Sequence, residues 1–251
     1  MIKEKLSFWT VVRTLTVYFL AFVIASIFII PCLICALLPE KIRYDNKFYF
    51  WCISVCCKLL LKISFLEVKI FGKYNIPDGP VIFVANHQSS IDIPIVAALI
   101  GSRKHIWLVL EYYANFPVLG FFVRRMNVTV DRGNTEKSAR SIVKVLRLLK
   151  DQDRDLIIFP EAARFIDGEI HKFMPGLAMF SKKLDRPVVP IYMPNNYKIY
   201  PPGSFWIHNH PVIAVIGQPF TCGENESEEE FTNRVHGWFV ALSENKTGQF
   251  R

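Results

Sequence analysis

The stretch VANHQSSID at residues 84–92 decides the architecture of this chain. It closes the apolar run 81–85 and opens a second apolar run, in which Pro94 falls in the first turn of a helix, where a missing N–H costs little. We therefore predict that a strand ends at Ala85, that a helix begins near Ile91, and that the polar residues between them form a strand-to-helix turn. Units of this kind build α/β folds.

This turn carries a histidine and an aspartate five residues apart, His87 and Asp92. Such a pair would not face each other on one continuous helix, but the two side chains can meet across a turn. A carboxylate on one imidazole nitrogen fixes the tautomer, and the other nitrogen can then take a proton from a substrate hydroxyl. A lone histidine in a turn is more often a surface or capping residue, so the prediction of a catalytic base depends on the rest of the sequence.

The remainder of the chain, from residue 65 on, alternates short β-type runs with helical stretches. Alternation of this kind predicts an α/β fold with a single mixed, partly parallel sheet flanked by helices. The turn-rich stretch 194–211 is expected to be an irregular loop. The expected strands are 66–71, 81–85, 106–110, 128–130, 156–159, 188–192 and 213–216, and the expected helices are 91–100, 117–126, 135–149 (capped by Asn134), 175–184 and 228–244.

The N-terminal part of the chain is apolar enough to meet a membrane. Residues 15–38 contain no charged side chain, and as one helix they would be roughly 36 Å long, enough to cross a bilayer core. Pro31 permits a kink or a break in this helix. A second apolar run covers 48–65. We therefore predict that residues 1–64 form a two-helix hydrophobic membrane anchor and that the catalytic domain follows, at residues 65–251.

Charge predicts how this anchor is oriented. Lys3, Lys5 and Arg13 precede the first apolar run, and Arg43 and Lys47 follow it. Both groups favour the cytoplasmic side, which a re-entrant anchor on one face satisfies. The alternative is a single crossing, with the N-terminus outside and the second apolar run lying flat on the cytoplasmic face.

Composition narrows the function classes. The 251 residues carry a formal net charge of +8, which suits nucleic acid or an anionic membrane surface. No zinc-finger spacing or RNA-binding motif supports nucleic acid. The CxxC spacing of Cys32 and Cys35 lies in an apolar run without a histidine or a second pair nearby, so we expect neither a metal site nor a disulfide there, and a reducing compartment.

The pattern Asn-His-x-x-x-x-Asp after a hydrophobic strand resembles the first motif of the glycerolipid acyltransferases, in particular the bacterial lysophosphatidate (1-acyl-sn-glycerol-3-phosphate) acyltransferases. The resemblance extends over roughly residues 68–217. Four further segments are similar to the family: VTVDR at 128–132 with Gly120 before it, FPEAAR at 159–164, KFMPG at 172–176 and VPI at 189–191.

The resemblance implies roles for individual residues. His87 is the catalytic base and Asp92 orients it. Arg164 grips the acceptor phosphate, Glu161 helps to hold the glycerol side, and Arg132 lies near the acceptor's polar head. The full set of substrate-binding residues that the resemblance implies is Asn86, Arg132, Glu161, Arg164, Lys172 and Gly176.

The sequence departs from the family at three positions. Ala162 and Ala163 stand where the third motif has Gly and Thr, and Leu110 stands where a lysine often precedes the second motif. If the glycine position needs an unusual backbone angle, Ala162 alters the loop. An acceptor other than lysophosphatidate therefore stays open.

The resemblance implies transfer of a fatty acyl group from acyl-CoA or acyl-ACP to the sn-2 hydroxyl of 1-acyl-glycerol-3-phosphate, giving phosphatidic acid. We expect no cofactor and no metal. The expected partners are the lipid bilayer, the lysolipid acceptor and the thioester donor, at the cytoplasmic face of a membrane (the inner membrane if the protein is bacterial). The alternatives are another acceptor (glycerol 3-phosphate or a lyso-aminolipid) and a non-catalytic lipid-binding protein. A lipid esterase is disfavoured because no nucleophile elbow surrounds Ser89 or Ser90.

Overall fold

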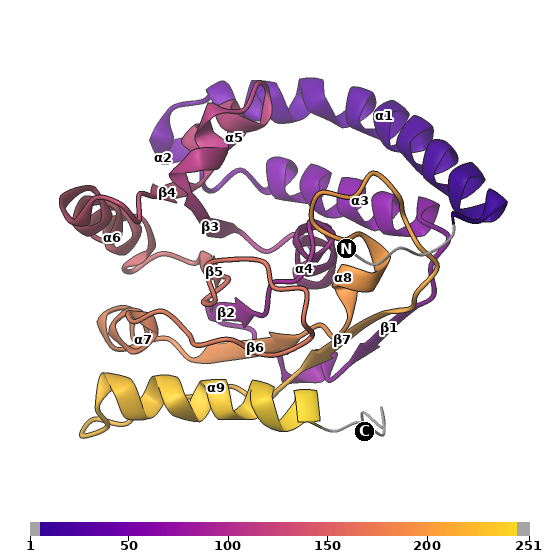
Figure 1. The fold of residues 1–251 in the computed structure, drawn as a ribbon. Helices are drawn as coiled ribbons and strands as arrows, with labels where there is room; N and C mark the ends of the chain where they lie inside the picture. Colours follow the sequence, from indigo (N-terminus) through magenta and orange to yellow (C-terminus); the bar gives the residue numbers. More distant parts are fainter. Residues whose placement is uncertain (1–5, 245–251) are drawn as a thin grey trace.

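A seven-stranded sheet runs through the centre of the computed structural model, which describes residues 6–244 (Figure 1). The strand order is β1-β7-β6-β2-β5-β3-β4, and every pairing is parallel except that of β6 with β7. The predicted single mixed sheet is therefore confirmed. The strands are β1 (Val68–Phe71), β2 (Ile82–Ala85), β3 (His105–Leu110), β4 (Val128–Val130), β5 (Asp155–Ile158), β6 (Val188–Tyr192) and β7 (Val212–Ile216).

Helices cover both faces of this sheet. The helices expected after residue 65 are all present, and Asn134 caps α6 by accepting from the backbone N of Lys137 at 2.9 Å. The one-turn helices α2 and α8 were not predicted, because four residues carry too little periodicity to be recognised. The helices are α1 (Phe8–Leu37), α2 (Glu40–Arg43), α3 (Lys47–Ile63), α4 (Asp92–Ile100), α5 (Leu119–Met126), α6 (Thr135–Leu149), α7 (Leu177–Leu184), α8 (Asn196–Ile199) and α9 (Glu228–Glu244), with 3-10 turns η1 (Lys73–Asn75) and η2 (Glu111–Asn115).

The alternation of side chains along β2 creates two hydrophobic cores. Phe83 and Ala85 face a core that α4 and parts of α1 and α3 complete, whereas Ile82 and Val84 face a core built with α6, α7 and α9. Figure 1 shows these layers, with α3 and α4 on one side of the sheet and α7 and α9 on the other. A strand buried on both faces reads as a continuous apolar run, as β2 does.

The two N-terminal helices form a hairpin, but the two-helix membrane anchor is not confirmed. The helix α1 continues through Pro31 and arches over α3, and it is the one helix within residues 6–244 that is long and apolar enough to cross a membrane. The helix α3 instead packs on α4 and buries side chains such as Phe50 and Leu61 against protein. Lys3 and Lys5, which contribute to the predicted orientation, lie outside the described residues.

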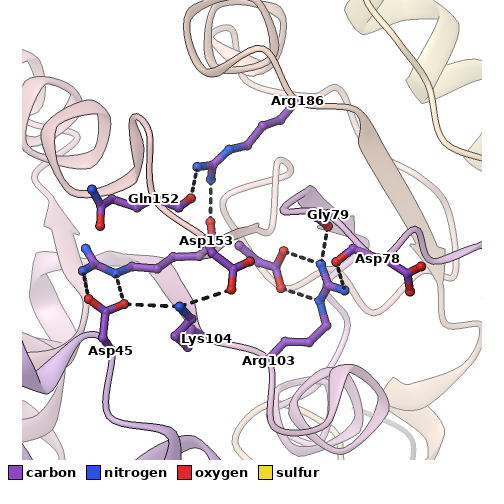
Figure 2. A network of polar contacts seen from close by, with 10 residues as sticks. Asp45, Asp78, Gly79, Arg103, Lys104, Gln152, Asp153 and Arg186 are labelled. Atoms are coloured by element: carbon purple, nitrogen blue, oxygen red, sulfur yellow. Dashed lines mark hydrogen bonds and ion pairs between the residues drawn. The ribbon is translucent and has the colours of Figure 1, made fainter.

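An ion pair between the buried Asp155 and the half-buried Arg103 closes the edge of the sheet at which the parallel strands begin. Asp155 begins β5, and its carboxylate accepts from Nε and Nη2 of Arg103 at 2.7 and 2.8 Å and from the backbone N of Val81 at 2.9 Å. Arg103 also donates to the carbonyl oxygens of Pro77 and Gly79. Figure 2 shows the contact with Gly79. Asp155 thereby joins β5, β2 and the segment before β3.

The same edge also binds the helical hairpin to the sheet. Asp45, between α2 and α3, accepts from Nη2 and Nε of Arg154 at 2.6 and 3.1 Å, and Lys104 lies 3.4 Å from it. The hydrogen bonds from Arg154 hold the pKa of Asp45 below its ordinary value. The hairpin is thus attached to the sheet by charge as well as by apolar contact.

We predict that Asp155→Ala destabilises the fold by about 3 kcal/mol, because it leaves Arg103 and an amide without their buried acceptor. The matched control is Asp153→Ala. Asp153 also pairs with a cation, Lys104, but its side chain is 75% exposed against 2% for Asp155, so its loss costs at most about 1 kcal/mol. Urea unfolding of both variants in detergent measures the difference, and equal losses would contradict this role for Asp155.

Candidate active site

Five strands deliver polar residues to one edge of the sheet. The strands β2, β3, β4, β5 and β6 are mutually parallel, so their carboxyl ends lie together. In open α/β sheets this edge is where ligands bind. The segments that follow these strands carry the candidate side chains, namely Asn86, His87 and Asp92 after β2, Tyr113 after β3, Arg132 after β4, Glu161 and Arg164 after β5, and Asn196 after β6.

The predicted pair of His87 and Asp92 meets across the turn after β2. Nδ1 of His87 lies 2.8 Å from Oδ2 of Asp92. The side chain of Asp92 is 1% exposed and that of His87 is 14% exposed. A proton on Nδ1 then satisfies the carboxylate and leaves the lone pair on Nε2 for an incoming hydroxyl.

Besides His87, three further hydrogen-bond donors hold the carboxylate of Asp92. Oδ2 also accepts from the backbone N atoms of Gln88 and Ser89 at 2.7 and 2.8 Å, and Oδ1 accepts from Nδ2 of Asn196 at 2.8 Å. Asp92 is the first residue of α4, where the helix dipole favours negative charge. The carboxylate is therefore fixed in place before any substrate arrives.

The turn after β5 holds His87 from the other side. The imidazole ring stacks on Phe159 with centroids 4.1 Å apart and planes 12° apart. The backbone N of His87 donates to Oε1 of Glu161 at 2.9 Å, and its carbonyl accepts from the backbone N of Phe165 at 3.2 Å. The segment 159–165 thus holds both the ring and the backbone of His87 in place.

The side chains of Glu161 and Asn86 are buried, and both form hydrogen bonds with backbone groups. The second carboxylate oxygen of Glu161 accepts from the backbone N of His171 at 3.0 Å. Burial raises the pKa of Glu161, against the lowering effect of the two amides. The amide of Asn86 donates to the carbonyl of Met193 at 2.9 Å and accepts from its N at 2.7 Å, which links β2 to the end of β6.

Ala162 occupies a backbone conformation that favours glycine. Its φ is +54°, in the left-handed region, and its backbone N closes a turn on the carbonyl of Phe159 at 3.0 Å. A residue with a Cβ is strained there by roughly 1–2 kcal/mol. The glycine-to-alanine departure noted in the sequence therefore leaves the turn intact, at the cost of local strain.

Two arginines present charge close to His87. Arg164 donates from Nη1 to Oγ of Ser90 at 2.6 Å and from Nη2 to the hydroxyl of Tyr113 at 3.3 Å. Arg132 donates from Nη1 to the carbonyl of Ala162 at 3.1 Å. Neither guanidinium forms an ion pair with a carboxylate within residues 6–244, so both charges are available to an anion.

Lys172 and Gly176 lie further along the segment that follows FPEAAR. Lys172 is exposed and makes no ion pair in the part of the chain that the structure describes. Gly176 precedes α7 with φ +110°, a conformation that side chains rarely adopt. The structure connects this segment to the site through the backbone N of Met174, which donates to the carbonyl of Pro160 at 2.9 Å.

Sequence reasoning missed Asn196 and Tyr113 as parts of the site, and it gave Phe159, in the FPEAAR segment, no role of its own. Asn196 lies in the stretch 194–211, which was expected to be an irregular loop, and here it begins α8. A signal was present, because two asparagines, at 195 and 196, follow the end of β6 at Tyr192 after only two intervening residues. Tyr113 had no comparable signal, since it enters the site through the 3-10 turn η2.

We predict that Asn196→Ala lowers turnover while the KM for the acceptor changes little, because it removes a buried donor from Asp92 and not a substrate contact. Leaving that carboxylate oxygen unpaired costs about 1–3 kcal/mol of stability. The matched control is Asn75→Ala, which removes a hydrogen bond of 2.8 Å to the carbonyl of Ile216 at another part of the sheet. Turnover per folded molecule should fall only in the Asn196 variant, and a change in KM alone would contradict the positioning role.

Comparisons with known proteins agree with this geometry. A family model described as Acyltransferase matches residues 67–194. The chloroplastic 1-acyl-sn-glycerol-3-phosphate acyltransferase BAT2 of Brassica napus is 32% identical over 179 residues, which cover 69% of this chain and 50% of the relative. The 1-acyl-sn-glycerol-3-phosphate acyltransferase of Pseudomonas aeruginosa is 23% identical over 236 residues, 91% of this chain and 90% of that protein.

A solved structure has the same fold. The crystal structure of the 1-acyl-sn-glycerophosphate (LPA) acyltransferase PlsC from Thermotoga maritima superposes with a TM-score of 0.77 and 24% identity, over 96% of this chain and 98% of that one. The chain spans about half the length of two plant relatives, 50% of the Brassica napus protein and 48% of the chloroplastic 1-acyl-sn-glycerol-3-phosphate acyltransferase LPAT1 of Arabidopsis thaliana. The family match covers the segment that carries His87, Asp92, Arg132 and Arg164, and the chain belongs to the acyltransferase family.

Proposed function

We propose that this protein transfers a fatty acyl group from an acyl thioester to the free sn-2 hydroxyl of 1-acyl-glycerol-3-phosphate, giving phosphatidic acid. The observation that carries the proposal is the His87–Asp92 pair at 2.8 Å beside two arginines that no carboxylate neutralises within residues 6–244. The names of the relatives support the same acceptor.

The reaction needs one base and no covalent enzyme intermediate. Nε2 of His87 accepts the proton of the acceptor hydroxyl as its oxygen attacks the thioester carbonyl carbon. The tetrahedral intermediate then collapses, the carbon–sulfur bond breaks, and the imidazolium returns its proton to the leaving thiolate. Asp92 stabilises the imidazolium between these steps.

Arg164 and Arg132 position the acceptor. A guanidinium binds phosphate oxygens in pairs through its planar fork. Holding the phosphate fixes the distance from the sn-2 hydroxyl to Nε2 of His87, and such positioning is a major contribution to rate. Ser90 and Tyr113, which now contact Arg164, lie where they can share the phosphate oxygens.

The donor is acyl-CoA or acyl carrier protein, which acts as a co-substrate, and we propose neither a cofactor nor a metal. Both donors are cytoplasmic, so we place the catalytic residues at the cytoplasmic face of a membrane, the inner membrane if the protein is bacterial. Residues 65–251 carry the transfer chemistry in this proposal.

The helix α1 supplies the membrane contact by lying along the membrane surface. Near its start, Oγ1 of Thr14 accepts from the backbone N of Ile207 at 3.0 Å, and at its end Arg125 donates to the carbonyl of Ala36 at 2.9 Å. These two points are roughly 33 Å apart along the helix, and both belong to the same packed body. A helix fixed in this way presents its exposed apolar face to one leaflet, which favours a one-sided anchor over a single crossing.

A different acceptor is the second candidate. Ala163 lacks the hydroxyl that the family motif carries, and Leu110 lacks the ammonium. Fewer polar contacts at the head group favour a smaller or differently charged acceptor, such as glycerol 3-phosphate or a lyso-aminolipid.

We predict that His87→Ala and Asp92→Asn each lower turnover by about 10²–10⁴-fold, the usual contribution of general base catalysis. Thermal melting of the His87 variant should stay near that of the parent, since Oδ2 of Asp92 keeps its hydrogen bonds from the two backbone amides. His210→Ala is the control, because His210 lies in a loop and its ring bonds the carbonyl of the neighbouring Pro211. A His87 variant with parental turnover would rule out the mechanism.

We predict that Arg164→Lys lowers kcat/KM for lysophosphatidate at least about tenfold, because an ammonium does not replace the paired donors of the fork. The rate on monoacylglycerol, which lacks the phosphate, should hardly change. Arg140→Lys, at an exposed position of α6, is the control. An equal loss on both acceptors would mean that Arg164 acts on the structure and not on the phosphate.

A further inference from the structure

An exposed apolar turn lies beside the active site. We name residues 112–119, which run from η2 to the start of α5, the apolar turn. Four large side chains of this turn are exposed although they are hydrophobic or aromatic, namely Tyr112, Phe116, Val118 and Leu119. Large apolar side chains gathered on a surface mark a contact with another apolar body.

The tip of the apolar turn is strained. Val118 has φ +60° and ψ −63°, and the backbone N of Leu119 bonds the carbonyl of Pro117 at 2.6 Å. This is the rare γ-turn with positive φ, and a β-branched residue at its centre is a conformational outlier. Gly120 lets the turn close tightly, because a Cβ there would overlap the carbonyl oxygen of Ala114. The fold therefore maintains an exposed valine at an unfavourable backbone angle.

The helix α5, which follows the apolar turn, packs against the C-terminal part of α1. Phe121 and Phe122, which follow the turn, pack in the same cluster as Cys32 and Ala36 of α1, and Arg125 donates to three carbonyls at the end of that helix. Figure 1 shows α5 against the C-terminal part of α1 at the same side of the molecule.

The charge of this segment suits an anionic surface. Residues 112–130 include Arg124 and Arg125 and no aspartate or glutamate. Tyrosine and phenylalanine next to basic residues are the side chains that favour the boundary between lipid headgroups and acyl chains. A second protein copy would not require this combination.

The apolar turn also reaches the phosphate site. The ring of Tyr113 stacks on Phe116 at 5.9 Å and 27°, and its hydroxyl accepts from Arg164 at 3.3 Å. One side of the turn therefore contacts the cation of the site, and the other side is exposed.

We propose that the apolar turn inserts into the lipid leaflet next to the active site and admits a lysolipid directly from the bilayer to Arg164. The insertion itself rests on the exposed side chains, and only the delivery step rests on the function proposed above. Tyr113 lies at the boundary, where a lipid headgroup passes from the membrane surface to the arginine.

The direct test places an environment-sensitive fluorescent amino acid at position 118, with position 143 as the matched control. Both are valines of similar exposure, 59% and 65%, but Val143 lies on α6. Vesicles of phosphatidylcholine and phosphatidylglycerol, with and without bromine on the acyl chains, serve as the lipid. We expect a blue shift and quenching by bromine at 118 and neither at 143. An unquenched probe at 118 on vesicle-bound protein, or a blue shift that rises with protein concentration without lipid, would overturn the proposal.

A kinetic comparison tests delivery separately. We expect Val118→Asp to lower the ratio of the rate on vesicle-embedded acceptor to the rate on a short-chain, water-soluble acceptor by roughly tenfold, about 1.4 kcal/mol. Val143→Asp should leave the ratio unchanged. Quenching at 118 with an unchanged ratio would overturn delivery and retain insertion. A failure of the proposed reaction would remove activity on both acceptors and would leave the quenching unaffected.

Discussion

The carboxylate of Asp92 is the point on which the site depends. It accepts four hydrogen bonds, from the imidazole of His87, two backbone amides and Asn196, while its side chain is almost wholly buried. A buried carboxylate is tolerated only when its oxygens are satisfied in this way. The turn after β2, the start of α4 and the start of α8 must therefore take up fixed positions relative to one another. The orientation of His87 follows from that requirement.

The sheet supplies the rest of the geometry. Because five neighbouring strands are parallel, the turns after β2 and β5 lie side by side, and Glu161 and Phe159 can hold the backbone and ring of His87. At the opposite edge, Asp155 and Arg103 join the start of β5 to the segments that precede β2 and β3. The two edges differ in their charges. At the edge where the parallel strands begin, Arg103 and Arg154 are paired with carboxylates. At the edge where they end, Arg132 and Arg164 form no ion pair with a carboxylate among residues 6–244.

Sequence alone predicted most of the fold, because each strand after residue 65 is a short apolar run bounded by turn residues. The His87–Asp92 pair was equally visible, since their spacing fits a strand-to-helix turn. The sequence did not show that α3 packs against protein, because a helix buried against protein and a helix in lipid share the same apolar composition. Asn196 was missed for a different reason. Its role depends on a contact with Asp92 across 104 positions of sequence, which no local pattern encodes. The family motifs include Glu161 and Asn86, but they do not indicate whether these side chains bind the backbone or a ligand.

The long apolar helix α1 and the candidate active site belong to one packed body. Hydrogen bonds near both ends of α1 fix this helix to the body that carries His87 and Asp92. In the one-sided anchor that we propose, the site therefore keeps a constant height above the leaflet. The most direct measurement is thiol release from acyl-CoA or acyl carrier protein by the purified protein in vesicles, with the lipid product weighed by mass spectrometry. Direct transfer predicts thiol release only when lysophosphatidate is present, with one phosphatidate formed per thiol. Release of thiol and free fatty acid without an acceptor, or no release with any lysolipid, would contradict it.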